Sequence, residues 1–192
     1  MLPETLAIAL KEWAAVIHAL RAGRQIVLLR KGGIYEAAGE FEIEHRQFLL
    51  LPTYLHQSRE QIKPSEHHRL EVRSTEPAEI VLDTAAEITE IIPLASRHQL
   101  QRIDAAHIWA APLIDMRFNY KPQNPLYLLL VRTYLLAAPV TIANSVELAG
   151  CKSWVPLPGP VATNARPALD DKAFAQATDA ILRAITAQPP YN

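Results

Sequence analysis

Residues 24–53 constrain the fold more than any other part of the sequence. Two apolar runs, Ile26–Leu29 and Phe48–Leu51, have the length and composition of buried strands. A polar segment that contains Gly32 and Gly33 separates them. Because glycine adopts a positive φ angle at low cost, the chain can turn at this pair. We therefore predict that the chain doubles back here and holds a polar site between two core strands.

Size and charge limit the class of protein. The chain has 192 residues, of which 49% are hydrophobic, so it can bury the core of one domain. Its 19 basic and 20 acidic residues nearly cancel, which excludes a strongly cationic coat for nucleic acid but allows a local basic patch. The single cysteine excludes an intramolecular disulfide framework and fits a reducing compartment.

The sequence also bears on location. Its first residues meet an acid at Glu4 and lack the basic start of a secretory signal. The longest apolar runs, near residues 126–140, are too short to cross a bilayer and are divided by Arg132. We expect a cytoplasmic protein with no membrane partner, and we find no indication of an oligomeric state.

Periodicity predicts three helices. Residues 4–22 carry an apolar stripe at steps of three and four and are followed by Gly23, a residue typical of helix C-termini. A middle helix is expected over 96–111, from the N-cap Ser96 to a stop at Pro112. A last amphipathic helix is expected over 170–188.

The remaining segments predict strands and a connector. Leu126–Leu136 is the strongest strand pattern, with Pro139 near its end, and residues 80–92 are expected to form either a hairpin or one bent strand. Residues 113–125 are expected to be irregular. We predict an α+β fold with a mixed, largely antiparallel sheet. The domain would span residues 1–157, a proline-rich connector 158–169, and the C-terminal helix would follow on that tether.

The polar segment suggests two kinds of site. Glu42 and Glu44 alternate along a predicted strand, so both carboxylates would lie on one face and could hold Mg²⁺ or Mn²⁺. Lys31 would then stabilise developing charge and His56 would relay a proton. The alternative is a solvated strand face on which Glu44 pairs with Arg46.

The second kind of site is a phosphate site. Arg30 and Lys31 precede the glycine pair, and two cations beside exposed backbone amides suit a phosphate. The alternative here is a glycine turn flanked by solubilising charges. His45 and Arg46 would complete the polar site from the opposite strand.

Several motifs resemble a bacterial family catalogued as a domain of unknown function. They are ALKEW at 9–13, LLRKGGI at 28–34, FLLLPT at 48–53, HIW at 107–109 and GCKSW at 150–154. The resemblance runs over most of the chain before the prolines. It implies that the chain shares the fold of this family, and it implies no particular activity.

Residues 78–142 are also similar to the strands of PUA-like domains, including the EVE and ASCH groups. That likeness implies binding of RNA or modified bases by aromatic and basic side chains. The residues that would do so here are Trp109, Arg117, Tyr120, Lys121 and Arg132.

The hypotheses for function follow from these sites. The first is a module that binds nucleic acid or another phosphate-bearing ligand. The second is a metal-dependent nuclease that uses Glu42, Glu44 and Lys31. The third is an adaptor whose C-terminal helix docks a partner protein.

Overall fold

The chain begins with a strand. The computed structural model describes residues 2–31, 36–37, 40–41, 45–148, 150 and 152–187. Strand β1 spans Thr5–Trp13, and helix α1 spans only Ala14–Arg21. The helix prediction for residues 4–22 is therefore wrong in its first half, because pairing on both edges of β1 outweighs the helix propensity of its alanines and leucines. The C-terminal role of Gly23 is confirmed by its φ angle of +65°.

The other elements follow in chain order. The remaining strands are β2 Val27–Arg30, β3 Glu36–Ala37, β4 Glu40–Phe41, β5 Gln47–Thr53, β6 Glu79–Leu94, β7 Leu126–Ala143, β8 Trp154–Ala162 and β9 Ala165–Pro167. The remaining helices are α2 Arg97–Arg102, α3 Ala111–Asn119 and α4 Asp171–Thr186, with 3₁₀ turns η1 Arg59–Gln61, η2 Pro64–Arg69, η3 Asp104–Ala106 and η4 Val146–Leu148. The predicted core strands at 26–29 and 48–51 are confirmed as β2 and β5.

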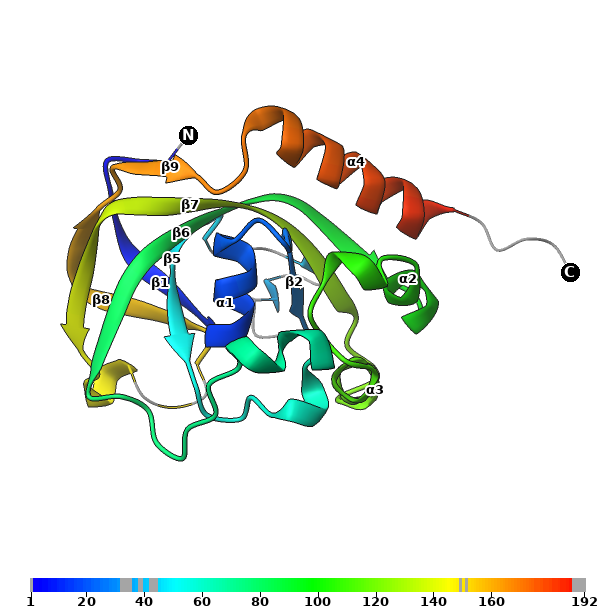
Figure 1. The fold of residues 1–192 in the computed structure, drawn as a ribbon, viewed down its shortest axis with the longest axis horizontal. Coiled ribbons are helices and arrows are strands. Elements are labelled where there is room, and N and C mark those ends of the chain that lie inside the picture. Colours follow the sequence, from blue (N-terminus) through cyan, green and yellow to red (C-terminus); the bar gives the residue numbers. More distant parts are fainter. Residues whose placement is uncertain are drawn as a thin grey trace, which may run out of the picture.

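The strands of the main sheet close into a ring. They run in the order β2-β7-β6-β5-β1-β8, and β9 returns to pair with β7. Since only Thr163 and Asn164 separate β8 from β9, the pairs β8–β1 and β9–β7 join the two sides of the sheet (Figure 1). All pairings are antiparallel except that of β1 with β5.

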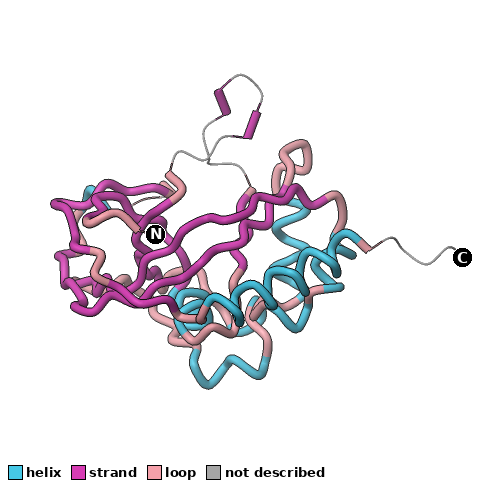
Figure 2. Tube along the Cα trace, turned by 90° about the horizontal axis from the view of Figure 1, so that it is seen from above, coloured by secondary structure: helices cyan, strands magenta, loops and turns pink. Residues whose placement is uncertain are grey.

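Two apolar cores lie on the two faces of these strands. Alternating side chains such as Leu49 and Leu51 of β5 point into the ring, where they pack with Leu82 and Val155. Phe48 and Leu50 point to the other face and pack with the helices. The helices gather on that side of the strands in Figure 2.

The prolines of residues 156–160 belong to an edge strand. In β8, Pro156 and Pro158 are exposed and alternate with the buried Val155 and Leu157. Proline lacks a backbone donor, so it is tolerated on a strand that pairs along one edge. Most of the expected connector 158–169 is thus part of β8 and β9.

Two other prolines differ from their predicted roles. Pro112 lies in the first turn of α3, where its missing N–H costs nothing, so it starts a helix instead of ending one. The middle helix is correspondingly short: α2 begins at the predicted cap Ser96 and ends at Arg102. Pro139 lies inside β7, in the interval where pairing with β6 shifts register, so it does not end the strand.

The C-terminal helix packs against the body. Asp170 caps α4 by accepting a hydrogen bond from the backbone N–H of Ala173 at 2.7 Å. Ile181 and Ile185 are buried in the helix-side core. The sheet is mixed and mostly antiparallel, so the α+β prediction is confirmed. No helix in the described part of the chain is long and apolar enough to span a membrane.

Candidate functional site

A cleft of about 550 Å³ opens where β1 and β5 end. Because these two strands are parallel, their carboxyl ends lie at the same edge of the sheet. Residues 11–13 of β1 and 51–53 of β5 therefore meet there. The end of β2, helix α3 and the segments around η4 and before β8 complete the walls.

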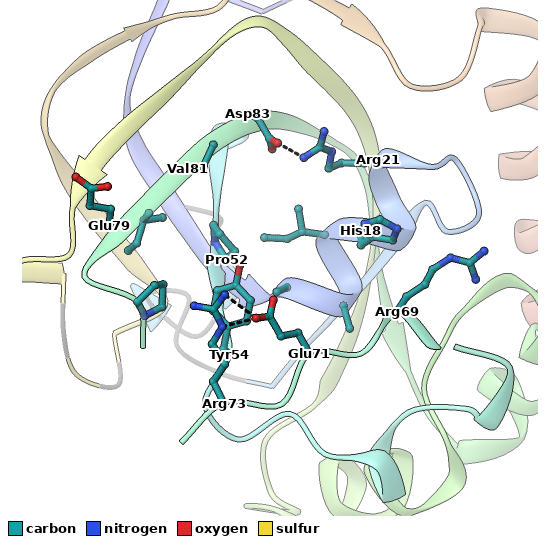
Figure 3. Close-up of a pocket in the computed structure, with 15 residues that line it drawn as sticks. His18, Arg21, Pro52, Tyr54, Arg69, Glu71, Arg73, Glu79, Val81 and Asp83 are labelled. Carbon is teal, nitrogen blue, oxygen red and sulfur yellow. Dashed lines mark hydrogen bonds and ion pairs between the residues drawn. The ribbon is translucent and has the colours of Figure 1, made fainter. Parts of the chain in front are cut away.

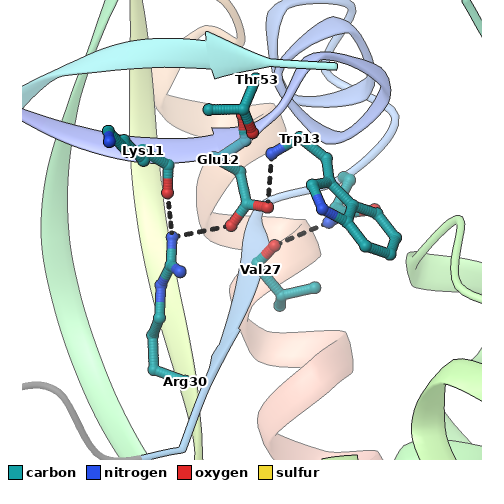
Figure 4. Close-up of polar contacts among 7 residues, drawn as sticks. Lys11, Glu12, Trp13, Val27, Arg30 and Thr53 are labelled. Carbon is teal, nitrogen blue, oxygen red and sulfur yellow. Dashed lines mark hydrogen bonds and ion pairs between the residues drawn. The ribbon is translucent and has the colours of Figure 1, made fainter. Parts of the chain in front are cut away.

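A buried ion pair lies in the wall of the cleft. Glu12 accepts a hydrogen bond from Arg30 Nη2 at 2.8 Å, and its other oxygen accepts one from the backbone N–H of Trp13 at 2.8 Å (Figure 4). Arg30 Nη2 also donates to the Lys11 carbonyl at 3.0 Å. The side chains of Arg30 and Glu12 are only 11% and 10% exposed. The pair fixes the Arg30 guanidinium at the end of β2, with its buried Nε atom unpartnered.

Arg117 of α3 brings a second guanidinium into the same cleft. No hydrogen bond or ion pair joins it to another residue in the described part of the chain, and its Nε atom is buried. Burial lowers the pKa of Arg117, and Arg30 lowers it further, whereas Glu12 raises it. An arginine remains charged despite such a shift, so this cation is held partly out of water with no ion pair to a described residue, and the nearby carboxylate of Glu12 is already paired with Arg30.

Cations outnumber acids in the cleft. Its described lining contains four cationic side chains, two acidic ones and His56; these six charged residues are Lys11, Arg30, Arg117, Lys152, Glu12 and Glu76. Arg30, Arg117 and His56 are among the residues that the sequence suggests for binding, although Arg117 was expected on a different surface from the other two.

His56 stands on a constrained turn at the rim. Its φ angle is +71°, a conformation that side-chain-bearing residues rarely adopt. Glu76 stabilises the turn by accepting hydrogen bonds from the backbone N–H groups of Tyr54 and Leu55 at 2.9 Å. The cleft thus gains an exposed imidazole on a turn whose backbone Glu76 holds in place.

Lys31 supports the cleft from outside. Its Nζ atom donates to the Phe118 carbonyl at 2.6 Å, so it ties the end of β2 to the last turn of α3. That turn carries Arg117. Burial lowers the pKa of Lys31.

The other predicted binding residues lie elsewhere. Trp109 is 3% exposed and packs 5.0 Å from the His107 ring, so its indole has no free face for a base. Arg132 forms an ion pair with Asp171 and lies over Phe174, which docks α4. Lys121 follows α3 and does not line the cleft.

The N-terminal end of β5 is distant from the cleft. Arg46 is exposed there, and seven extended residues at about 3.3 Å each place it roughly 20 Å from Thr53. His45 contacts the Trp154 ring at 5.3 Å. The structure therefore does not bring either residue together with Arg30 and His56.

The predicted metal ligands Glu42 and Glu44 lie outside the described residues. Within the described part, no group of three or more histidine, cysteine, aspartate or glutamate residues is placed to hold a metal ion. The magnesium or manganese site stays a prediction.

A second pocket, of about 350 Å³, lies between α1 and the segment 69–83 (Figure 3). Its arginines are compensated: Arg21 pairs with Asp83, and Arg73 pairs with Glu71. Burial lowers the pKa of His18 in this pocket, and the charge of Arg24 lowers it further. Arg69, the third arginine of the described lining, pairs with Glu66, so each of these arginines has an acidic partner and this pocket is the weaker candidate.

Lys11 and Lys152 were not expected in the site, and Glu12 was expected on a helix, where it would be an additional metal ligand. On a helix over residues 4–22, Lys11 and Glu12 fall off the apolar stripe and would face water. A strand over 5–13 instead puts Glu12 on the same face as Leu10, beside Arg30. The continuous apolar run of residues 6–10 was the available signal for a buried strand.

Comparison with known families supports the motif resemblance. Residues 9–180 match the family model described as a domain of unknown function, DUF1802. The chain belongs to this family. No curated protein matches the chain.

Solved structures with a similar chain path come from Zymomonas mobilis. Its ASCH protein matches with a TM-score of 0.42 at 11% identity, covering 90% of this chain and 92% of the other. Two single-residue variants give TM-scores of 0.45 and 0.43 at 11% and 10% identity, covering 90% and 93% of this chain and 95% and 98% of the other.

Proposed function

We propose that this cleft binds a phosphate-bearing ligand, with nucleic acid first among the candidates. The observation that carries the proposal is Arg117, a guanidinium held partly out of water with no described partner beside a second, fixed guanidinium. Such a charge is costly unless something pairs with it. Phosphate oxygens accept the paired N–H groups of arginine in good geometry, so a phosphate would supply the missing partner.

The near-neutral net charge restricts how nucleic acid would bind. A protein with a net charge of −1 has no overall cationic coat, so binding would depend on a local group of basic side chains. A contact confined to one cleft needs only a few phosphates. The site therefore favours a short single-stranded segment or a mononucleotide over a duplex.

The test removes the unpartnered charge. Arg117→Gln is preferable to an Arg30 substitution, because loss of Arg30 would leave Glu12 buried and unpaired. We expect wild-type protein to bind labelled single-stranded RNA or DNA at low salt, measured by fluorescence anisotropy. Arg117→Gln should weaken this binding about tenfold or more, as expected for loss of a charge-assisted contact.

The matched control is Arg183→Gln on α4, whose side chain is 81% exposed. It removes the same charge far from the cleft and should leave the affinity unchanged. Lack of binding by the wild-type protein to both polymers, or equal weakening by both variants, would refute the proposal.

A further inference from the structure

We propose that the second pocket, between α1 and the segment 69–83, binds a nucleobase of the strand whose phosphate lies in the cleft. The inference rests on the proposed function and adds a site for an uncharged group beside the site for phosphate. It follows from the position of this pocket next to the cleft, from its paired charges and from the aromatic ring in its wall.

The cleft and the second pocket share part of their walls. Pro52 of β5 and Ile80 of β6 line both. The two strands pair over residues 47–49 of β5 and 85–87 of β6, and in the described part of the chain no ladder joins the stretches that carry Pro52 and Ile80. The strands therefore diverge beside both pockets, and one ligand can contact both.

Consecutive residues at the end of β5 contribute to the two pockets in turn. Thr53 lines the cleft, Tyr54 lines the second pocket and Leu55 lines the cleft again. Side chains alternate between opposite sides of an extended chain, and neighbouring Cα atoms are only about 3.8 Å apart. The two linings are therefore within reach of adjacent groups of a single strand.

The charges of the second pocket are paired. Each arginine of its described lining forms an ion pair with an acid, and the pairs are Arg21–Asp83, Arg73–Glu71 and Arg69–Glu66. A phosphate bound here would lie close to these carboxylates, whereas an uncharged base adds no charge that must be balanced. The pocket therefore suits a group that has hydrogen-bond donors and acceptors but no charge, as a nucleobase has.

Tyr54 gives the second pocket a flat surface. The residue is half-buried, and the guanidinium of Arg73 lies 4.3 Å from the centre of its ring (Figure 3). Arg73 also donates to Glu71 at 2.6 Å, which holds the guanidinium in place. Bases stack on aromatic rings and on arginine planes, and Ile17 and Val81 add apolar surface nearby. A planar base therefore matches this wall better than a sugar does.

The experiment separates the contribution of the base from that of the phosphate. A single-stranded DNA trinucleotide is compared with an abasic DNA of the same length, which has the same sugars and phosphates but no bases. Binding of each to the full chain is measured by competition with a labelled oligonucleotide in fluorescence anisotropy. We expect the trinucleotide to bind about tenfold more tightly than the abasic DNA, as expected for stacking of one base.

Substitutions locate the base. Tyr54→Leu removes the ring and should lower the affinity for the trinucleotide to that for the abasic DNA, whose own binding should not change. Unchanged binding of the abasic DNA also shows that this variant is folded. Tyr54→Phe keeps the ring and should retain the preference. Arg117→Gln should weaken both ligands by the same factor, because it removes a phosphate contact alone.

The outcomes distinguish this inference from the proposed function. Equal affinity of the wild-type protein for the two DNAs would overturn the base pocket and leave the proposed function standing. A preference that survives in Tyr54→Leu, or equal weakening of both ligands by that variant, would also overturn the assignment of the base to this pocket. Absence of binding to either DNA would overturn both proposals.

Discussion

At the scale of single residues, Arg117 is the position where function and stability oppose each other. Its charge is partly buried with no described partner, and burial lowers its pKa. Groups of this kind cost stability in the free protein and are kept where a ligand supplies the partner.

The free protein should therefore become more stable when Arg117 is removed. We expect Arg117→Met to raise the free energy of unfolding by about 0.5–2 kcal/mol, because the apolar side chain occupies the site without a desolvated charge. Urea denaturation at neutral pH measures this directly. Destabilisation by this variant would show that Arg117 makes a stabilising contact that the described residues do not account for.

His107 makes stability depend on pH. Burial lowers its pKa to about 4, with the charge of Lys63 lowering it further and Asp104 opposing the shift. Between pH 6.5 and about 4 the unfolded chain binds a proton that the folded protein does not. Stability therefore falls as the pH falls through this window, by up to roughly 3 kcal/mol.

Replacement of His107 should remove this dependence. His107→Gln is expected to be less stable than wild type at pH 7, with the difference shrinking as the pH approaches 4, measured by urea denaturation at each pH. A parallel decline of the two proteins over the window would contradict the assigned pKa.

At the scale of elements, the tether between β2 and α3 positions the candidate site. Lys31 donates to the Phe118 carbonyl, one residue beyond Arg117. A cation at the carboxyl end of a helix also interacts favourably with the helix dipole. Lys31 thus helps to position Arg117 in the cleft by holding the last turn of α3.

Loss of the tether should loosen the last turn of α3. We expect Lys31→Met to lower the local opening free energy of this turn by about 1 kcal/mol, seen as faster hydrogen exchange of its amides. Lys31→Arg keeps a donor and should restore the protection. If exchange is unchanged but ligand binding is lost, Lys31 contacts the ligand itself, as the sequence had suggested.

At the scale of the whole molecule, the C-terminal segment is part of the fold. β9 pairs with β7, and α4 buries Ile181 and Ile185 against the body. An adaptor with a detachable helix requires a body that stays folded without this segment, and these contacts oppose that requirement.

Truncation tests whether the C-terminal segment is part of the fold or a detachable helix. A chain that ends after Val161 loses β9 and α4, and burial of two isoleucine side chains alone is worth about 1.5–3 kcal/mol each. We expect it to lose its cooperative thermal transition. A chain that ends after Ala187 keeps every described contact and should unfold like the full chain; a stable, cooperative body after truncation at Val161 would support the adaptor hypothesis.

Local sequence determined a good part of the structure. The strands β2 and β5, the capping box at Ser96, the turn at Gly23 and the amphipathic α4 all follow from apolar spacing and from residues with strong backbone preferences. These signals act within a few residues along the chain, so they can be read without knowing the fold. Arg30 was named as a candidate site residue from a local signal of the same kind, its position next to Lys31 and the glycine pair.

Only the tertiary structure decided which residues meet. The segment 5–13 has the composition of a helix, yet it is a strand because it lies between β5 and β8. The prolines around residue 158 were expected to form a tether, but most of them lie in β8 and β9, whose pairing with β1 and β7 closes the ring. Arg30 and Arg117 share a cleft because β2 and α3 pack together. The two elements are far apart in the sequence, so no local pattern of residues predicts this contact.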